Sequence, residues 1–369
     1  MERIPVFSPW IDFEDFESVN RALNLGWISG TSPIVEEFED AIAHLSDRKY
    51  VAAVSNGSVA LDLAFEALKL SPGDEVILPN FTIISCLAAV VRTGAKPILI
   101  DVDPITWNMR LEDVEAAYSS KTKAVLVVHI YGLPSPVDHI SEFCRKNGIF
   151  LIEDAAEAHG IKVSGQPCGS FGDVSTFSFY ANKHVTAGEG GAVCTNSEEQ
   201  YSRIISMRNL AFGKKNRFQH EEFGWNYRLG GLASALGISQ LTKLSRIIAL
   251  KKIQGATYNQ LLSNASSHLQ LPAPTANGSE NNFWVYGIVC EDESSTSRLV
   301  RNLEKNGVES RPFFYPLSEQ PAFKKLEIGL RFDVKNSLRL GSCGIYIPTG
   351  SHIDASKQQR ISEVILSSF

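Results

Sequence analysis

The sequence predicts an α/β protein with a mainly parallel sheet that helices cover on both faces. Continuous runs of Val, Ile and Leu alternate with amphipathic helical segments through the first half of the chain, and strands buried on both faces have this composition. The 369 residues are 44% hydrophobic and 21% charged, which is ordinary for a globular protein and too apolar for a disordered one.

The first half of the chain carries the expected sheet. Its predicted elements, in order, are helices over 15–25 and 35–45, a strand over 50–54, a helix from 55–58 to about 70, a strand over 75–78, a helix over 85–91, a strand over 97–100, a helix over 111–117, a strand over 124–128, a helix over 137–146 and a strand over 149–152. Ligands of such sheets bind beyond the carboxyl ends of the strands.

The pattern changes in the second half. Strands are expected over 174–179 and 192–195, on either side of a glycine-rich turn, and helices over 197–207 and 231–262. A polar stretch over 263–282 with two prolines and four asparagines marks a domain boundary. We therefore expect a large domain over 1–262 and a small α+β domain over 263–369, the latter with a strand over 283–290 and helices over 295–306 and 354–366.

Charge and cysteine content exclude several classes of protein. The formal net charge of −6 argues against a nucleic-acid partner, which requires a basic surface. No apolar run approaches the roughly 20 residues of a membrane span, and no secretory signal is visible at the N-terminus. The six cysteines lie far apart, so we expect reduced thiols, no metal and a cytoplasmic location.

A polar turn between the 50–54 strand and the following helix is the first candidate site. Residues 55–58 read Ser-Asn-Gly-Ser, and free amides at a helix start, with a glycine that allows close approach, suit a phosphate. An ordinary helix cap explains the same residues.

A second candidate follows the 149–152 strand. Asp154 lies at the ligand-binding edge of the sheet, with Glu157 and His159 close behind, and a carboxylate there can pair with a protonated ring nitrogen. A helix N-cap is the alternative interpretation.

The third candidate is Lys183, which follows an aromatic strand and precedes three glycines within positions 188–191. Most lysines are solvated surface charges, but the apolar strand and the glycine turn favour a semi-buried amine that can form a Schiff base. A phosphate site, an aspartate for a pyridinium nitrogen and a lysine are together what pyridoxal 5'-phosphate (PLP) requires.

With these motifs the chain resembles the DegT/DnrJ/EryC1/StrS family of PLP-dependent, fold-type I nucleotide-sugar aminotransferases, and within it the GDP-perosamine synthases. The resemblance spans nearly the whole chain, with landmarks at 26–30, 54–58, 73–79, 129–132, 177–191, 226–228 and 311–316. It implies transfer of an amino group from L-glutamate to a nucleotide-linked 4-keto-6-deoxy sugar, with pyridoxamine phosphate (PMP) as an intermediate. GDP-4-keto-6-deoxy-D-mannose is expected first, in deoxysugar synthesis of the kind that supplies lipopolysaccharide O-antigen.

The resemblance also implies residue roles. Lys183 would be the catalytic lysine, and Asp154 and Glu157 would contact the ring nitrogen and the ring hydroxyl. The cofactor phosphate would be bound by Gly57, Ser58 and Ser178, and by Asn226 of a neighbouring subunit in a homodimer with shared active sites. Ile83 would cover the ring. The expected substrate contacts are Trp27, His159, Arg311 and Tyr315.

Two departures and three alternatives accompany this interpretation. Many relatives have an aromatic residue in place of Ile83 and a histidine in place of Ser318, and the second difference concerns substrate choice.

The alternatives are an aminotransferase for another keto sugar (dTDP- or UDP-linked, at C3 or C4), a PLP/PMP-dependent sugar 3-dehydratase, which would have a histidine at position 183, and a non-catalytic family member.

Overall fold

A computed structural model describes residues 3–213 and 216–369. Its larger sheet has seven strands in the order β1-β9-β8-β5-β4-β2-β3. All neighbours pair in parallel except β9, which is antiparallel to both β1 and β8, so the mainly parallel α/β fold is confirmed. The strands are β1 (Tyr50–Val54), β2 (Glu75–Pro79), β3 (Lys96–Ile100), β4 (Thr122–Val128), β5 (Phe150–Asp154), β8 (Val174–Ser178) and β9 (Gly191–Thr195).

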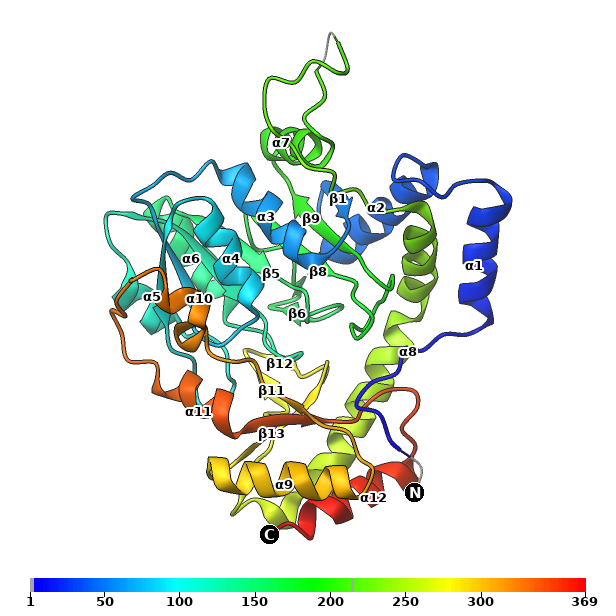
Figure 1. The fold of residues 1–369 in the computed structure, drawn as a ribbon, viewed down its shortest axis with the longest axis vertical. Coiled ribbons are helices and arrows are strands. Elements are labelled where there is room, and N and C mark those ends of the chain that lie inside the picture. The colour runs from blue at the N-terminus through cyan, green and yellow to red at the C-terminus, as the bar shows by residue number, and fades with distance from the viewer. Residues whose placement is uncertain (1–2, 214–215) are drawn as a thin grey trace.

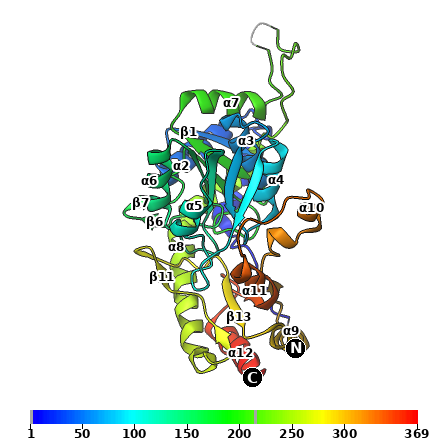
Figure 2. The ribbon, with the colours of Figure 1, turned by 90° about the vertical axis from the view of Figure 1, so that its left-hand side faces the viewer.

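Alternate side chains of these strands enter two apolar clusters on opposite faces. Val76 and Leu78 of β2 belong to one cluster and Ile77 to the other, which is the two-residue period of a strand. Figure 2 shows α4 and α6 on opposite sides of the sheet. The first face is covered by α3 (Gly57–Leu68), α4 (Ile84–Arg92) and α7 (Glu198–Arg208), and the second by α2 (Pro33–Ser46), α5 (Leu111–Ala117), α6 (Val137–Asn147) and α8 (Gly231–Leu261).

A smaller antiparallel sheet lies at the other end of the molecule, and α8 runs towards it from the large sheet (Figure 1). Its order is β10-β13-β15-β14, and Ile4 near the N-terminus forms a parallel bridge with Val308 beside it. The sheet consists of β10 (Leu269–Gln270), β13 (Tyr286–Cys290), β14 (Arg311–Pro312) and β15 (Gly344–Ile347), with α9 (Glu293–Lys305), α11 (Lys335–Cys343) and α12 (Ala355–Leu366) around it.

The remaining elements are short or peripheral. The α1 helix (Phe13–Asn24) packs on α8, and two hairpins are formed by β6 (Lys162–Val163) with β7 (Gln166–Pro167) and by β11 (Thr275–Ala276) with β12 (Ser279–Glu280). Single turns are η1 (Ser263–Ala265), η2 (Leu317–Glu319) and α10 (Pro321–Lys324). Across residues 3–213 and 216–369, no helix has the length and apolarity to cross a membrane.

The strand expected over 283–290 begins three residues late. Phe283 has a φ of 48°, a left-handed conformation that interrupts an extended strand. The side chain of Asn281 stabilises this turn by accepting a hydrogen bond from the Phe283 amide at 2.7 Å. The expected polar stretch before it contains β10, β11 and β12 rather than uniform coil.

Candidate active site

A cavity of about 1070 Å³ lies where β5 and β8 end and α3 begins. Because β9 is antiparallel to both of its neighbours, β1 and β8 run in the same direction, and the start of α3 falls at the carboxyl edge of the sheet. This is the usual ligand position in such folds. The residues predicted from the sequence that line the cavity are Gly57, Ser58, Ile83, Asp154, Glu157, Ser178 and Lys183.

The first turn of α3 presents free donors to the cavity. The Asn56 side chain caps the helix by accepting a hydrogen bond from the Val59 amide at 3.1 Å, and its carbonyl accepts from Ala60. Within the described chain, the amides of Gly57 and Ser58 have no protein acceptor. The positive end of a helix dipole and two free N–H groups suit a phosphate group.

Two glycines allow the backbone to close around this turn. A Cβ atom on Gly57 would lie 2.8 Å from the Ser178 Cβ, and one on Gly191 would lie 2.5 Å from the Asn56 carbonyl carbon. Both distances are shorter than real Cβ contacts. A side chain at Gly57 would separate α3 from the end of β8, and one at Gly191 would separate the start of α3 from the start of β9. The Ser178 hydroxyl and the helix amides therefore face the same part of the cavity.

Asp154 is a buried carboxylate whose hydrogen bonds come from neutral groups. Its oxygens accept from the Ala156 amide at 3.0 Å, the Thr176 hydroxyl at 3.4 Å and the Cys86 thiol at 3.5 Å. Burial raises the pKa of Asp154, although the charge of Lys183 opposes this shift. A protonated ring nitrogen would supply the adjacent positive charge that favours its ionised form.

Lys183 and Glu157 face each other inside the cavity. The Lys183 Nζ lies 3.4 Å from Glu157 Oε1, and the side chains are 10% and 7% exposed. The other carboxylate oxygen of Glu157 accepts a hydrogen bond from the Tyr131 amide at 2.8 Å. Burial raises the pKa of Glu157 to about 7, and the neighbouring lysine limits the rise. The predicted amine is therefore semi-buried, next to a group that titrates near neutral pH.

Aromatic side chains that the sequence did not mark enclose the rest of the cavity. Tyr180 and Tyr227 belong to the motifs at 177–191 and 226–228, so proximity in sequence could have suggested them. Phe314 lies in the motif at 311–316 and could have been suggested in the same way. Trp284 and Tyr346 also line the cavity, but they come from segments more than 100 residues after Lys183. No local pattern connects those segments to the site.

Five of the expected residues do not line this cavity, and four of them lie at or near the surface or in ion pairs. Asn226 is exposed and forms an antiparallel bridge with Asn209 at the end of α7, although its neighbours Trp225 and Tyr227 line the cavity. The Trp27 ring lies 5.7 Å from the Arg21 guanidinium. Arg311 is ion-paired with Glu309 at 2.6 Å, and Tyr315 is 54% exposed.

His159 also lies outside the cavity, packed in the protein interior. Its ring stacks against Phe177 and Phe179 at centroid distances of 5.7 and 5.4 Å, and it is 0% exposed. Burial lowers the pKa of His159 well below its usual value, so the ring is neutral. These contacts give His159 a packing role, and a substrate contact would require the ring to leave them.

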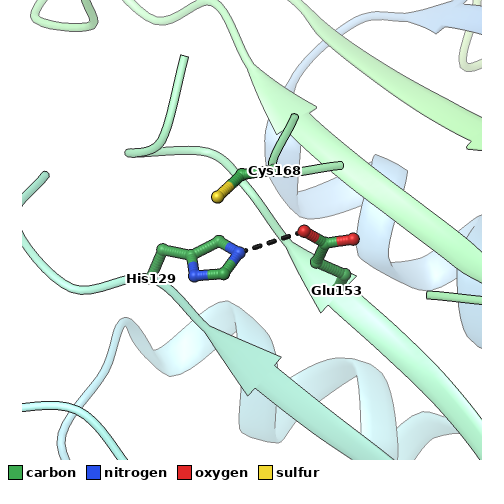
Figure 3. Close-up of side chains that lie close together, drawn as sticks. All are labelled: His129, Glu153 and Cys168. Atoms are coloured by element: carbon green, nitrogen blue, oxygen red, sulfur yellow. Dashed lines mark hydrogen bonds and ion pairs between the residues drawn. The ribbon is translucent and has the colours of Figure 1, made fainter. Parts of the chain in front are cut away.

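A further polar cluster of His129, Glu153 and Cys168 is fully buried beneath the sheet edge (Figure 3). Three such ligand types within 4.8 Å of one another could hold a metal ion. Glu153, however, already accepts hydrogen bonds from His129 and from the amides of Phe171 and Gly172. These bonds fix the loop after β7, and they leave the carboxylate saturated without an ion.

A semi-buried lysine, a buried carboxylate that accepts hydrogen bonds from neutral groups, and amides at a helix start without an acceptor in the described chain meet at the carboxyl edge of this sheet. They fit the aldehyde, the ring nitrogen and the phosphate of PLP, and fold and site together define a PLP-dependent enzyme of fold type I. The sequence profile of the DegT/DnrJ/EryC1/StrS aminotransferase family matches residues 9–366. The chain belongs to this family.

Individual relatives support the assignment along the whole chain. The GDP-perosamine synthase of Vibrio cholerae is 36% identical over 336 residues, covering 90% of this chain and 91% of that protein. The dTDP-4-dehydro-2,3,6-trideoxy-D-glucose 4-aminotransferase of Saccharopolyspora spinosa is 32% identical, covering 87% and 86%. The crystal structure of the aminotransferase TlmJ from Streptoalloteichus hindustanus superposes with a TM-score of 0.91 at 28% identity, covering 98% of each chain. The chain is a nucleotide-sugar aminotransferase.

Proposed function

We propose that this enzyme transfers an amino group from L-glutamate to a GDP-linked 4-keto-6-deoxy-D-mannose, forming GDP-perosamine in the cytoplasm. The observation that carries the chemistry is the Lys183 amine, held 3.4 Å from Glu157 in a cavity that Asp154 also lines. The choice of sugar is supported by the relatives with perosamine synthase activity in their names.

Each site residue has a role in this proposal. Bound PLP supplies an aldehyde that binds amines and a protonated ring that withdraws electrons from the substrate carbon. The Gly57 and Ser58 amides and the Ser178 hydroxyl bind the phosphate, and the Asp154 carboxylate holds the proton on the ring nitrogen. Lys183 Nζ would hold the aldehyde, and the same amine would move the proton at the reacting carbon.

Glu157 and Ile83 complete the cofactor site in this proposal. The Glu157 carboxyl group orients the ring hydroxyl. Ile83 is 43% exposed and lines the cavity, so its side chain can cover one face of the ring by apolar contact. Ser318, by contrast, is buried and exchanges hydrogen bonds with Asn80 at 2.8 and 3.1 Å, and we assign it to the support of its loop.

We further propose a homodimer in which Asn226 contacts the neighbouring subunit's cofactor. Its exposed position outside its own chain's cavity supports this role. Within each subunit, residues 1–262 would form the cofactor domain and residues 263–369 the small domain, which supplies Trp284 and Tyr346 to the cavity wall. Arg311 pairs in register with Tyr346, so it stands next to this wall and is retained as a candidate substrate contact.

A substrate panel tests the reaction. The purified enzyme with PLP and L-glutamate is offered GDP-, dTDP- and UDP-linked keto sugars, and 2-oxoglutarate is measured. We expect the highest kcat/KM with GDP-4-keto-6-deoxy-D-mannose. Preference for a dTDP-linked sugar would support the alternative that the Saccharopolyspora spinosa relative suggests.

A covalent-capture experiment tests the role of the lysine. Borohydride reduction of the PLP-loaded enzyme should fix the cofactor on the peptide that contains Lys183, with loss of the visible absorption band. Lys183→Ala should bind PLP only non-covalently and lose transamination. Near-wild-type turnover of this variant would exclude the lysine from the mechanism. Capture on Lys183 without any transamination would favour the non-catalytic alternative, and no capture on this lysine would favour the dehydratase alternative.

A further inference from the structure

The amine of Lys183 lies on the face of an indole ring. Its Nζ is 3.7 Å from the centroid of the Trp284 ring, with Glu157 Oε1 at 3.4 Å. Trp284 is 5% exposed, so water has little access to the amine from this side. The negative face of an indole attracts an ammonium group, most strongly in a site without water.

Trp284 is fixed at both its ring and its backbone. Its indole N–H donates a 2.7 Å hydrogen bond to the carbonyl of Asn182, the residue before Lys183. Its own carbonyl accepts a hydrogen bond from the Lys251 Nζ at 3.1 Å. The indole therefore contacts the amine with its face and holds the adjacent backbone with its edge.

Lys251 is a buried cation held by neutral groups. It projects from α8, is 7% exposed, and makes its second hydrogen bond with the Thr349 hydroxyl at 2.6 Å. Lys251 has no carboxylate partner in the described part of the chain. Burial lowers the pKa of Lys251 to about 7. An amine buried in this way costs stability compared with an apolar side chain, which points to a role other than stabilisation.

We propose that Trp284 is a further catalytic residue, which holds the Lys183 amine in its reactive position and shields it from water, and that Lys251 is a positioning residue for Trp284. The inference rests on the proposed role of Lys183 as the cofactor-binding lysine. Between turnovers the released amine then returns to one defined place beside Glu157. Loss of the indole leaves the amine mobile and more accessible.

The test measures the reactivity of Lys183 without cofactor or substrate. Full-length, cofactor-free protein is treated with formaldehyde and cyanoborohydride, and the methylation rate of Lys183 is measured by peptide mass spectrometry relative to that of Lys96 in the same sample. Trp284→Leu should raise the relative rate about tenfold, the scale of a desolvated cation–π contact. Trp284→Phe, which keeps an aromatic face, should raise it less than about threefold.

Lys251→Met tests the positioning role, with Lys252→Met as a matched control on the same helix. Lys252 is ion-paired with Glu280 at 2.6 Å, outside the cavity. Lys251→Met should raise Lys183 methylation several-fold and lower kcat, with little change in the KM for the nucleotide sugar, whereas Lys252→Met should match the wild type.

Equal methylation of Lys183 in the folded wild-type, Trp284→Leu and Lys251→Met proteins would overturn the inference. If Trp284→Leu does not fold, the methylation rates of Lys183 in Trp284→Phe and Lys251→Met test the inference instead. Wild-type methylation rates in both variants would overturn the inference. Methylation of Lys183 does not depend on turnover, so the two proposals can fail separately. An altered methylation rate together with no activity on any keto sugar would reject the proposed substrate reaction but would still support the contact between Trp284 and the amine.

Discussion

Replacement of Glu157 by glutamine should change how the stability of the protein depends on pH. The glutamine keeps the shape of the side chain and removes the carboxyl proton. In the wild type, burial raises the pKa of Glu157 from 4.5 to about 7, even though Lys183 Nζ lies 3.4 Å away. The native state therefore binds this proton more tightly than the unfolded state does.

The sign and the size of the effect follow from this difference in proton affinity. A group whose pKa is higher in the folded state stabilises the protein below its unfolded pKa, and this contribution is lost as pH rises through the folded pKa. The interval from 4.5 to about 7 corresponds to about 3 kcal/mol of the free energy of unfolding. Between pH 5 and pH 8 the wild type should lose roughly 2 to 3 kcal/mol of stability that Glu157→Gln retains.

Urea unfolding of cofactor-free protein at pH 5, 6, 7 and 8 measures this difference. The free energy of unfolding of Glu157→Gln minus that of the wild type should increase steadily across the series. Glu115→Gln, at an exposed position of α5, is the control and should show a difference that does not vary with pH. A constant difference for Glu157→Gln, or one that decreases towards pH 8, would refute the reasoning.

Three further variants test the cofactor site and the dimer. Asp154→Asn should lower kcat by about 10²-fold, because the ring nitrogen loses its charged partner, and a change confined to the KM for glutamate would contradict that role. Gly57→Ala should weaken PLP binding about tenfold or more, because its Cβ would lie 2.8 Å from a neighbouring side chain. Spectrophotometric titration measures PLP binding. The control is Gly329→Ala, whose Cβ would meet no atom within 4 Å. Mixed dimers of inactive Lys183→Ala and Asn226→Asp subunits should recover activity towards half that of the wild type, because one of their two sites carries both changes and the other carries neither. If subunit exchange is proven and no activity is recovered, Asn226 serves the cofactor of its own chain.

Local patterns in the sequence predicted most elements of the large sheet. The strand Tyr50–Val54 and the helix Leu111–Ala117 have the predicted limits, because the strand is an apolar run between Lys49 and Ser55 and the helix has helical apolar spacing. The short strands β14 and β15 and the helix α11 were not predicted. Strands as short as β14 and β15 depend on tertiary pairing, and their sequences are too short to show a periodicity.

The sequence by itself also determined which residues meet at the carboxyl edge of the sheet. Gly57, Asp154, Ser178 and Lys183 follow or end strands that run in the same direction, so their shared strand direction brings them into one cavity. His159 and Glu157 both follow the strand that ends at Asp154. The chain turns between these two residues, however, and the His159 ring packs on Phe179. Strand position therefore predicts the place of a residue better than the direction of its side chain.

Only the tertiary structure decided what surrounds the lysine. Trp284 reaches Lys183 because the segment before β13 packs into the apolar cluster on one face of the large sheet. Lys251 reaches Trp284 because α8 runs from the large sheet to the small one (Figure 1). These contacts join segments about 70 and 100 residues from Lys183 along the chain. The sequence around a single tryptophan or lysine does not indicate such a contact, because the packing of distant elements determines which residues meet.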